Sequence, residues 1–427
     1  MHLTRRSALQ ACCAACAVCA VPAAGAVVAG TPPGIGINPD FDPTAAVWLS
    51  YDEGHAAMTR GLVAALHAHV KLRFLVADDA AAEQVRAMPF AGLDVHVQPQ
   101  ASFFLRDMAV FARDAQGRAG IVDFVASQYG AAAWCLRRYA RGDDRQWCTT
   151  HARTTAAERD RLDRDFAERL NASVHASPLS LEGGGVEVNG RGLMIACEEL
   201  HRSRNPELSR AQVENELLRL PGVRKVLWLP AGLAEDVLLR ATITGPFVAW
   251  GAGGHTDEFV RFADERTVLL AWSDEADALR HPVARLNRQR MQRNWVLLAA
   301  ATDTQGRRLR VIKVPMPRIV QRRVVLSDQA QIDAAEEWST DYFAPQERRR
   351  IGESLWQVAT ASYLNFVVAN GVVVLPDFVP HGTSPQQQDR VRQLFAGVFP
   401  GRRVEFVNGI SAHWVGGGLH CATLNQP

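Results

Sequence analysis

Outside its first thirty residues, the sequence has no apolar run long enough to cross a bilayer. A spanning helix needs about 20 consecutive apolar residues, so we expect no membrane span in the rest of the chain. The sequence also has no block of basic residues, because 47 Lys and Arg are balanced by 45 Asp and Glu, for a formal charge of +2. We therefore expect no nucleic-acid partner.

Long linkers and low-complexity tracts are also missing. Only residues 31–43 are rich in Pro and Gly, and we expect them to form a short lead-in. The hydrophobic fraction of 48% and the charged fraction of 22% are typical of a globular protein. A chain of 427 residues can hold one large domain or two to three ordinary ones. Because no linker divides it, we predict a single catalytic domain over residues 31–427.

Cysteine is scarce beyond the N-terminal segment, because four of the eight cysteines lie in the first thirty residues. A chain of this length can bury a large core without disulfides. The short separation of Cys135 and Cys148 allows them to pair in an oxidising compartment, and it equally allows two buried thiols. Cys197 ends an apolar run and is expected in the core.

The first thirty residues have the three-part layout of a signal peptide. Arg5 and Arg6 precede an uncharged run from Ala8 to Val21, and an A-x-A cleavage site follows at 24–26. The paired arginines are similar to a twin-arginine export signal, which predicts export to the periplasm or the extracellular space. A membrane anchor would need a longer apolar run. A lipoprotein modified at Cys19 would need a leucine three positions earlier. Cleavage would remove both arginines and bring the formal charge to zero.

Short strands and helices alternate along the chain, which predicts an α/β fold. Ser209 with Gln212 forms a capping box, Thr155 with Glu158 forms another, and Ser384 starts a helix with Pro385 at its first position. The recurring order of helix, turn and strand indicates an architecture of similar modules. Strands are predicted at 47–49, 72–76, 93–97, 225–229, 247–250, 268–272, 310–314, 363–368, 372–375 and 404–407.

Cys421 follows the run Gly416-Gly417-Gly418-Leu419-His420 near the end of the chain. Three glycines let the backbone approach a ligand closely and adopt positive φ. A phosphate-binding loop would need a following Lys-Ser or Lys-Thr, which is missing. A structural thiol is the usual role of a cysteine in such a place. The glycines and His420 favour a nucleophile instead.

A second motif, Gly254-His255-Thr256-Asp257, offers a histidine next to a carboxylate. If the segment is extended, His255 and Asp257 point to the same side, and the pair can serve as general acid and base near neutral pH. An exposed polar pair is the alternative. Asp107 beside Arg106 is equally typical of a local ion pair at a strand end, and Glu182 before three glycines is typical of a turn.

Three kinds of chemistry fit these residues. A zinc site would use His255, Asp257, His420 and Cys421. A cysteine protease would use Cys421 with His255. Neither explains a second carboxylate such as Asp107. A guanidinium substrate does, because two carboxylates can hold the planar cation by charge-assisted hydrogen bonds and direct its carbon to sulfur.

Taken in order, the motifs resemble the agmatine deiminase and Porphyromonas-type peptidyl-arginine deiminase family. They are Arg-Asp at 106–107, Glu-Gly-Gly at 182–184, Gly-His-x-Asp at 254–257 and Gly-Gly-Gly-x-His-Cys at 416–421. The similarity runs from about Val47 to Gln426 and includes residues 361–366 and 371–376. It implies the pentein fold, a propeller-like ring of about five ββαβ modules with approximate fivefold symmetry and a central active site.

The resemblance also implies a role for each site residue and neither a metal nor a cofactor. Asp107 and Asp257 would hold the guanidinium. His255 would protonate the leaving ammonia and later activate water. Cys421 would form a covalent thiouronium intermediate, and Asn365 and Glu182 would line or support the site.

The expected reaction is hydrolysis of a guanidino group to a ureido group with release of ammonia. The substrate would be agmatine, free arginine or peptidyl-arginine. An amidinotransferase and an exported guanidine-binding protein without turnover stay open. The sequence departs from agmatine deiminases near the first motif, where Phe104 precedes and Met108-Ala109-Val110 follows. The loop 128–151, which carries Cys135 and Cys148, is expected to shape the pocket for the substrate tail.

Overall fold

One arrangement of strands and helices is repeated five times in the molecule. In the computed structural model, which describes residues 36–114, 116–138, 143–328 and 336–427, two antiparallel strands lead through a helical segment to a third strand. The third strand lies parallel to the second in every case. This confirms the predicted α/β pentein fold of five ββαβ modules. The predicted signal segment, residues 1–30, lies outside the described residues.

The strands of the five modules are β22 (Thr423–Gln426), β2 (Ala46–Leu49) and β3 (Lys71–Val76); β5 (Val110–Arg113), β6 (Ala119–Val125) and β7 (Ser173–Ser180); β8 (Glu187–Val188), β9 (Leu193–Cys197) and β10 (Lys225–Leu229); β13 (Val260–Phe262), β14 (Thr267–Trp272) and β15 (Arg310–Pro315); and β19 (Val367–Ala369), β20 (Val372–Pro376) and β21 (Arg403–Val407). Their helices are α1 (Ala56–Leu66), α5 (Leu162–Leu170), α6 (Glu198–Arg204), α7 (Arg210–Leu217), α8 (Glu275–Arg280), α9 (Pro282–Ala300) and α10 (Pro385–Val398). In the first module, β3 also pairs in parallel with β4 (Asp94–Val97), beyond α2 (Asp79–Arg86).

The first module is completed by the C-terminal strand of the chain. The last strand, β22, runs antiparallel to β2, with Leu49 opposite Thr423 and Ala46 opposite Gln426. The C-terminal segment thereby forms the edge strand of the first module's sheet, whose order is β22–β2–β3–β4. Cys421, two residues before β22, is held by this pairing.

Local sequence signals explain where several helices begin. Ser209 caps α7 in a capping box with Gln212, as predicted. The Ser384 hydroxyl accepts a hydrogen bond from the Gln387 amide at the start of α10, with Pro385 in the first turn. The capping box predicted at Thr155 is wrong, because Thr155 lies inside α4 (Asp143–Arg159). Its hydroxyl donates to the carbonyl of His151 instead, at 3.0 Å.

The predicted strands overlap observed ones, apart from most of 363–368. Residues 363–366 form a turn, and β19 begins only at Val367. The apolar side chains of Tyr363, Leu364 and Phe366 are buried in the core cluster, so their hydrophobicity reflects packing rather than pairing in a sheet.

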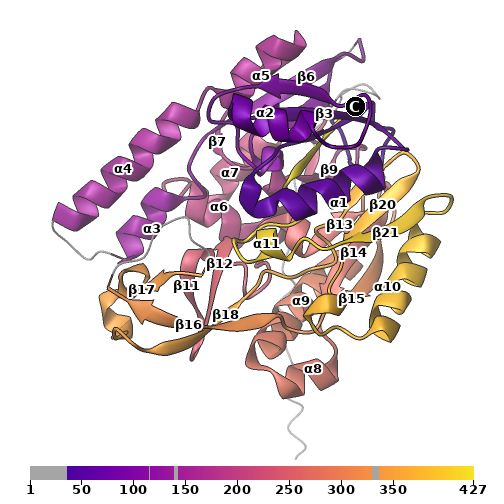
Figure 1. Cartoon of the computed structure of the whole chain (residues 1–427). Helices are drawn as coiled ribbons and strands as arrows, with labels where there is room; N and C mark the ends of the chain where they lie inside the picture. Colours follow the sequence, from indigo (N-terminus) through magenta and orange to yellow (C-terminus); the bar gives the residue numbers. More distant parts are fainter. Residues whose placement is uncertain (1–35, 115, 139–142, 329–335) are drawn as a thin grey trace, which may run out of the picture.

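Two additions accompany the modules. A sheet with the order β11–β12–β18–β16–β17 lies beside them, formed by Leu238–Thr244, Phe247–Ala252, Ser354–Val358, Gln321–Ser327 and Trp338–Ser339. The segment expected as a loop over 128–151 is largely helical, because it contains α3 (Ala131–Arg138) and most of α4. Cys135 and Cys148 are joined by a disulfide that links these two helices. Figure 1 shows α4 along the outside of the molecule.

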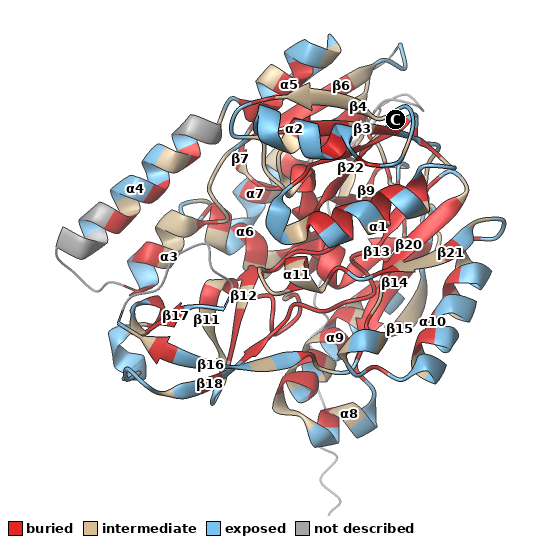
Figure 2. Ribbon diagram, in the orientation of Figure 1, coloured by how far each residue is buried: buried red, intermediate tan, exposed pale blue. Residues whose placement is uncertain are grey.

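The strands of the modules form most of the buried interior (Figure 2). Strand β9 is buried at every position, and Cys197 at its end is fully enclosed, as predicted. Helices α2, α4 and α10 expose part of their surface to solvent (Figure 2). None of the helices in the described ranges is long and apolar enough to span a membrane.

Candidate active site

The fold brings five predicted site residues together, because all five occupy the same position in their modules. Each stands just before the first strand of a different module. They are Asp107 before β5, Glu182 before β8, Asp257 before β13, Asn365 before β19 and Cys421 before β22. Because the modules are arranged in a ring, these five segments converge at its centre. Three of the segments are short 3-10 turns, at Leu105–Asp107, Gly183–Gly185 and Thr256–Glu258.

The Cys421 thiol is buried, with 2% of the residue exposed. The Asn365 amide donates to Sγ at 3.1 Å, and Asp257 Oδ2 lies 3.3 Å from Sγ. Burial raises the pKa of Cys421 well above its usual value, and the Asp257 carboxylate raises it further. The preceding glycines are sterically required, because a Cβ on Gly418 would come within 2.4 Å of Asn365 Oδ1.

The His255 ring lies among three carboxylates. Nε2 is 3.4 Å from Glu182 Oε2, whereas Nδ1 is 3.8 Å from Asp107 Oδ1 and 3.9 Å from Asp257 Oδ1. Burial lowers the pKa of His255, but Asp107, Glu182 and Asp257 outweigh it and raise the pKa to about 9. His255 is therefore an imidazolium at neutral pH and can donate a proton.

The extended conformation considered for His255 and Asp257 does not form, but the two side chains do come close, with His255 Nδ1 3.9 Å from Asp257 Oδ1. Asp257 belongs to the 3-10 turn Thr256–Glu258, for which His255 is the preceding residue. Asp236 fixes the backbone that leads into the turn, because its carboxylate accepts four hydrogen bonds from the backbone N–H groups of residues 252–255. Gly253 and Gly254, with φ of 87° and 105°, permit this tight wrap around a carboxylate.

Glu182 supports His255 from the opposite side. Both of its oxygens accept hydrogen bonds from Arg204 Nε, at 3.0 and 2.9 Å, and the Arg204 guanidinium is fully buried. Burial raises the pKa of Glu182, but Arg204 and His255 more than offset it and lower the pKa to about 2. Glu182 is thus a permanent anion, as an anchor for His255 requires.

The Asp107 carboxylate is also enclosed. Oδ1 accepts from the Gly184 amide at 3.0 Å, and Oδ2 accepts from the Tyr129 hydroxyl at 2.9 Å. Burial and the nearby Asp257 and Glu182 carboxylates raise its pKa to about 6 despite the opposing effect of His255. A Cβ on Gly184 would come within 2.4 Å of His255 Nδ1, so the glycine lets these groups approach one another.

The predicted alternative of a local Arg106–Asp107 ion pair is not what forms. Arg106 Nη1 lies 3.2 Å from Asp40 Oδ1, on the far side of the site. Asp40 also contacts Arg261 Nη2 at 2.7 Å and His420 Nε2 at 2.6 Å. Although burial opposes ionisation, Arg106, His420 and Arg261 hold the pKa of Asp40 far below its ordinary value.

His420 does not face the sulfur of its neighbour. Its Nδ1 lies 2.7 Å from Asp257 Oδ2, and its Nε2 is engaged by Asp40. Both ring nitrogens are therefore occupied by carboxylates. The result is a buried chain from Asp40 through His420 to Asp257 that fixes one oxygen of Asp257 and leaves the other, Oδ1, free to bind a ligand.

The four residues considered for zinc do not converge as a ligand set, because His420 has no free nitrogen. Among the described residues, the acidic and thiol groups close enough to share an ion are Asp257, Glu258 and Cys421. Asn365 donates to Glu258 Oε1 at 2.8 Å, and burial together with neighbouring carboxylates raises the pKa of Glu258 well above its usual value. A carboxyl group that holds its proton is a poor ligand for a metal ion.

Sequence reasoning missed Asp40, Tyr129, Arg204 and Asp236. Asp236 stands next to Glu235 between apolar residues, a pattern that is a weak signal of a buried carboxylate. Asp40 and Arg204 carry no such local signal, because their partners lie far away in the sequence. Tyr129 lies in the segment 128–151, which the sequence links to the substrate tail rather than to the guanidinium.

The finished site presents buried polar atoms that suit a planar cation. His255 Nδ1 and Asp257 Oδ1 are buried 3.9 Å apart, and neither has a hydrogen-bond partner among the described residues. Asp107 and Asp257 both lie within 4 Å of His255, and Sγ lies against Asp257. A guanidinium has five N–H donors and a positive charge, which suits two carboxylates flanking a thiol.

Known proteins are similar to this chain over most of its length. A model of the Porphyromonas-type peptidyl-arginine deiminases matches residues 39–427. An agmatine deiminase of Medicago truncatula is 32% identical over 61% of this chain and 60% of its own length. Another from Ectopseudomonas mendocina is 33% identical over 58% of this chain and 57% of its own length. The matched segments thus span about 57–60% of these curated relatives.

Solved structures show the same fold. The agmatine deiminase of Enterococcus faecalis superimposes with a TM-score of 0.68 and 20% identity, covering 95% of this chain and 99% of that one. An agmatine deiminase of C. jejuni superimposes with a TM-score of 0.61 and 16% identity, covering 92% of this chain and 96% of that one. Since the family model matches nearly all of the described residues, the chain belongs to the Porphyromonas-type peptidyl-arginine deiminase family.

Proposed function

We propose that the protein hydrolyses a guanidino group to a ureido group and ammonia, with Cys421 as the nucleophile. The observation that carries the proposal is the enclosed thiol beside Asp257, with Asp107 and the imidazolium of His255 close by. Membership of the family and similarity to agmatine deiminases support it.

In the first half of the reaction, Asp107 and Asp257 hold the guanidinium and orient its carbon towards Sγ. The bound cation neutralises the carboxylates that raise the pKa of Cys421, and the thiol then releases its proton to solvent. The thiolate attacks and forms a C–S bond. His255 gives its proton to the departing nitrogen as the C–N bond breaks, which leaves ammonia and a thiouronium on Cys421.

In the second half, neutral His255 takes a proton from water, and the hydroxide adds to the thiouronium carbon. The C–S bond then breaks and restores the thiolate, and the ureido product releases one proton to solvent. Ammonia takes up one proton from solvent to become ammonium, and the thiolate takes up another to become the thiol of the free enzyme. In sum, one guanidinium ion and one water give one neutral ureido product and one ammonium ion. His255 is an acid first and a base second, as microscopic reversibility demands.

For the substrate tail we propose a small amine or neutral chain, as in agmatine. The cavity next to Asp107 is lined by three carboxyl residues, Asp107, Asp163 and Glu182, and no Lys or Arg is among its described lining residues. A free α-carboxylate would find no positive partner there. The side chains of the site are largely buried, which favours a free small molecule over an arginine within a folded protein.

The test is a panel of agmatine, free arginine and an arginine-containing peptide, assayed for ammonia and ureido product. We expect turnover of agmatine above the other two and its loss in Cys421→Ala. Cys197→Ala is the matched control, because Cys197 is the other free cysteine of the described chain and its sulfur packs against the backbone at Gly254 rather than against a guanidinium-binding carboxylate. Turnover that persists in Cys421→Ala would contradict the mechanism.

We also propose export through the twin-arginine segment at residues 5–6. The Cys135–Cys148 disulfide supports this proposal, because such bonds persist in oxidising compartments. Cell fractionation with Arg5→Lys/Arg6→Lys tests it. The variant should stay in the cytoplasm, whereas equal export of both forms would contradict the proposal.

A further inference from the structure

The sulfur of the site belongs to a buried residue, although a substrate has to reach it. His255 and Asn365 are fully buried, and Cys421 is 2% exposed. Asp107 and Asp257 are the carboxylates proposed to bind the guanidinium. Among the described residues, Tyr129 is the only partly exposed one whose side chain hydrogen-bonds to either of them. It belongs to residues 126–130, which connect β6 to α3 and which we name the gate segment.

The gate segment reaches two of the site carboxylates with neutral hydroxyl groups. The Tyr129 hydroxyl donates to Asp107 Oδ2 at 2.9 Å, and the Ser127 hydroxyl donates to Glu182 Oε1 at 3.1 Å. Burial and the Asp107 carboxylate raise the pKa of Tyr129 well above its usual value, so it remains a donor at all physiological pH values. A guanidinium bound to Asp107 would meet the Tyr129 hydroxyl on the same carboxylate.

The backbone of the gate segment is held in an unusual conformation. Gln128, Tyr129 and Gly130 follow one another in the left-handed region, with φ of 51°, 55° and 73°. Only the glycine adopts this region without steric cost, so the two preceding residues are strained. The strain persists only while the contacts on both sides of the segment hold it.

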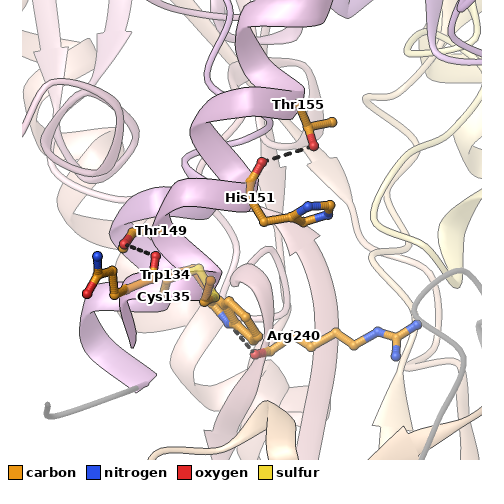
Figure 3. The surroundings of a disulfide bond; sticks show 8 residues. Trp134, Cys135, Thr149, His151, Thr155 and Arg240 are labelled. Atoms are coloured by element: carbon orange, nitrogen blue, oxygen red, sulfur yellow. Dashed lines mark hydrogen bonds between the residues drawn. A yellow bond between two sulfur atoms is a disulfide. The ribbon is translucent and has the colours of Figure 1, made fainter. Parts of the chain in front are cut away.

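On the outer side those contacts come from the disulfide-linked helices. Gln128 Nε2 donates to the carbonyl of Thr155 in α4 at 3.4 Å, and the Ala126 amide donates to Asp160, which directly follows α4, at 2.9 Å. Helix α3 begins directly after the segment and is anchored by Trp134, whose indole N–H donates to the Arg240 carbonyl (Figure 3). The Cys135–Cys148 bond joins α3 to α4 and so ties both supports of the segment together.

We propose that Tyr129 is a specificity-determining residue that gates the site, and that the disulfide-linked helices hold it closed. This proposal rests on the proposed function. A ligand must displace the Tyr129 hydroxyl from Asp107 in order to bind. A charged, bidentate donor replaces a neutral hydroxyl readily, whereas a neutral ligand such as urea does not. The gate thereby selects cationic guanidinium compounds and releases the strained backbone when one binds.

The test measures access to Cys421 and does not need turnover. The oxidised protein is treated with iodoacetamide, and alkylation of Cys421 and Cys197 is followed by peptide mass spectrometry at several pH values. Comparing the alkaline plateau rates removes differences in thiol pKa. In Tyr129→Phe we expect Cys421 to react about tenfold faster, as for the loss of one hydrogen bond to a charged group. Cys135→Ser/Cys148→Ser should react at an intermediate rate.

Tyr342→Phe is the matched control, because the buried Tyr342 hydroxyl has no hydrogen-bond partner among the described residues and the side chain lies in the apolar cluster of the sheet β11–β12–β18–β16–β17. Its Cys421 rate should equal that of the wild type. If circular dichroism shows that the double cysteine variant is unfolded, Gln128→Ala replaces it. Equal Cys421 rates in the wild type and Tyr129→Phe would overturn the inference.

Steady-state kinetics with agmatine separate this inference from the proposed function. Tyr129→Phe should lower KM about tenfold and change kcat much less, because the hydroxyl competes with the substrate for Asp107. A wild type without turnover would contradict the proposed function and leave the alkylation result valid. An active wild type with unchanged KM in Tyr129→Phe would contradict the gate alone.

Discussion

Asp107 and His255 titrate at opposite ends of the neutral range. Asp107 has a pKa of about 6 and has to be ionised to bind a cation, whereas His255 has a pKa of about 9 and has to be protonated to release ammonia. We therefore predict a bell-shaped dependence of kcat/KM on pH, with limbs near 6 and 9 in the free enzyme. Measuring kcat/KM from pH 5 to 10 checks this, and an activity that keeps rising above pH 9 would contradict the role of His255.

Glu182 and Arg204 form a buried pair whose disruption should be costly. Glu182→Gln leaves the fully buried Arg204 charge without its anion, so we predict a loss of about 3–5 kcal/mol in the free energy of unfolding. The exposed pair of Glu265 and Arg191 provides the control, and Glu265→Gln should cost no more than about 1 kcal/mol. Urea unfolding of both variants measures the difference. Equal losses would mean that Glu182 is not the anchor described.

The sequence predicts the residues that stand in motifs, but not those that hold them. Cys421, His255, Asp257 and Asp107 could be identified because glycines and ordered motifs surround them. Asp40 could not, since its partner His420 lies 380 positions away and only the ring closure brings them together. Long-range charge pairing of this kind leaves no local pattern.

At the scale of elements, the helix caps predicted from the sequence are confirmed at Ser384 and wrong at Thr155. The Ser384 hydroxyl caps α10, whereas Thr155 lies within α4. We predict that Ser384→Ala lowers the free energy of unfolding by about 1 kcal/mol, and that Thr155→Ala costs nothing or stabilises slightly, because Ala has the higher helix propensity. Thermal unfolding of both variants tests this. A loss of about 1 kcal/mol in Thr155→Ala would mean that Thr155 caps a helix and would contradict this prediction.

Most predicted strands are observed because a run of β-branched residues between turns is a sufficient signal in this fold. The segment 363–366 fails, since apolar residues that pack in a turn look the same as those of a strand. The sequence also does not predict the helical structure of α3 and α4. The disulfide and the contact of Trp134 with β11 stabilise it, and both are tertiary features.

For the molecule as a whole, closure of the ring depends on its last strand. Strand β22 pairs with β2 over four residue positions and carries Cys421 into the site. We predict that removing residues 423–427 strongly lowers the melting temperature and abolishes agmatine turnover, because β2 loses one of its two partner strands. Removing residues 1–30 should leave the melting temperature unchanged. Differential scanning calorimetry of the two truncations compares them, and an unchanged midpoint in the first would contradict the closure.

The most direct test of the account is to trap the intermediate on Cys421. The wild type is mixed with agmatine and quenched in acid within the first turnovers, and its peptides are analysed by mass spectrometry. The account predicts a substrate-derived thiouronium on the Cys421 peptide, none on the Cys197 peptide, and none anywhere in Cys421→Ala, which should also release no ammonia. Ammonia release from Cys421→Ala at the wild-type rate would contradict the central claim.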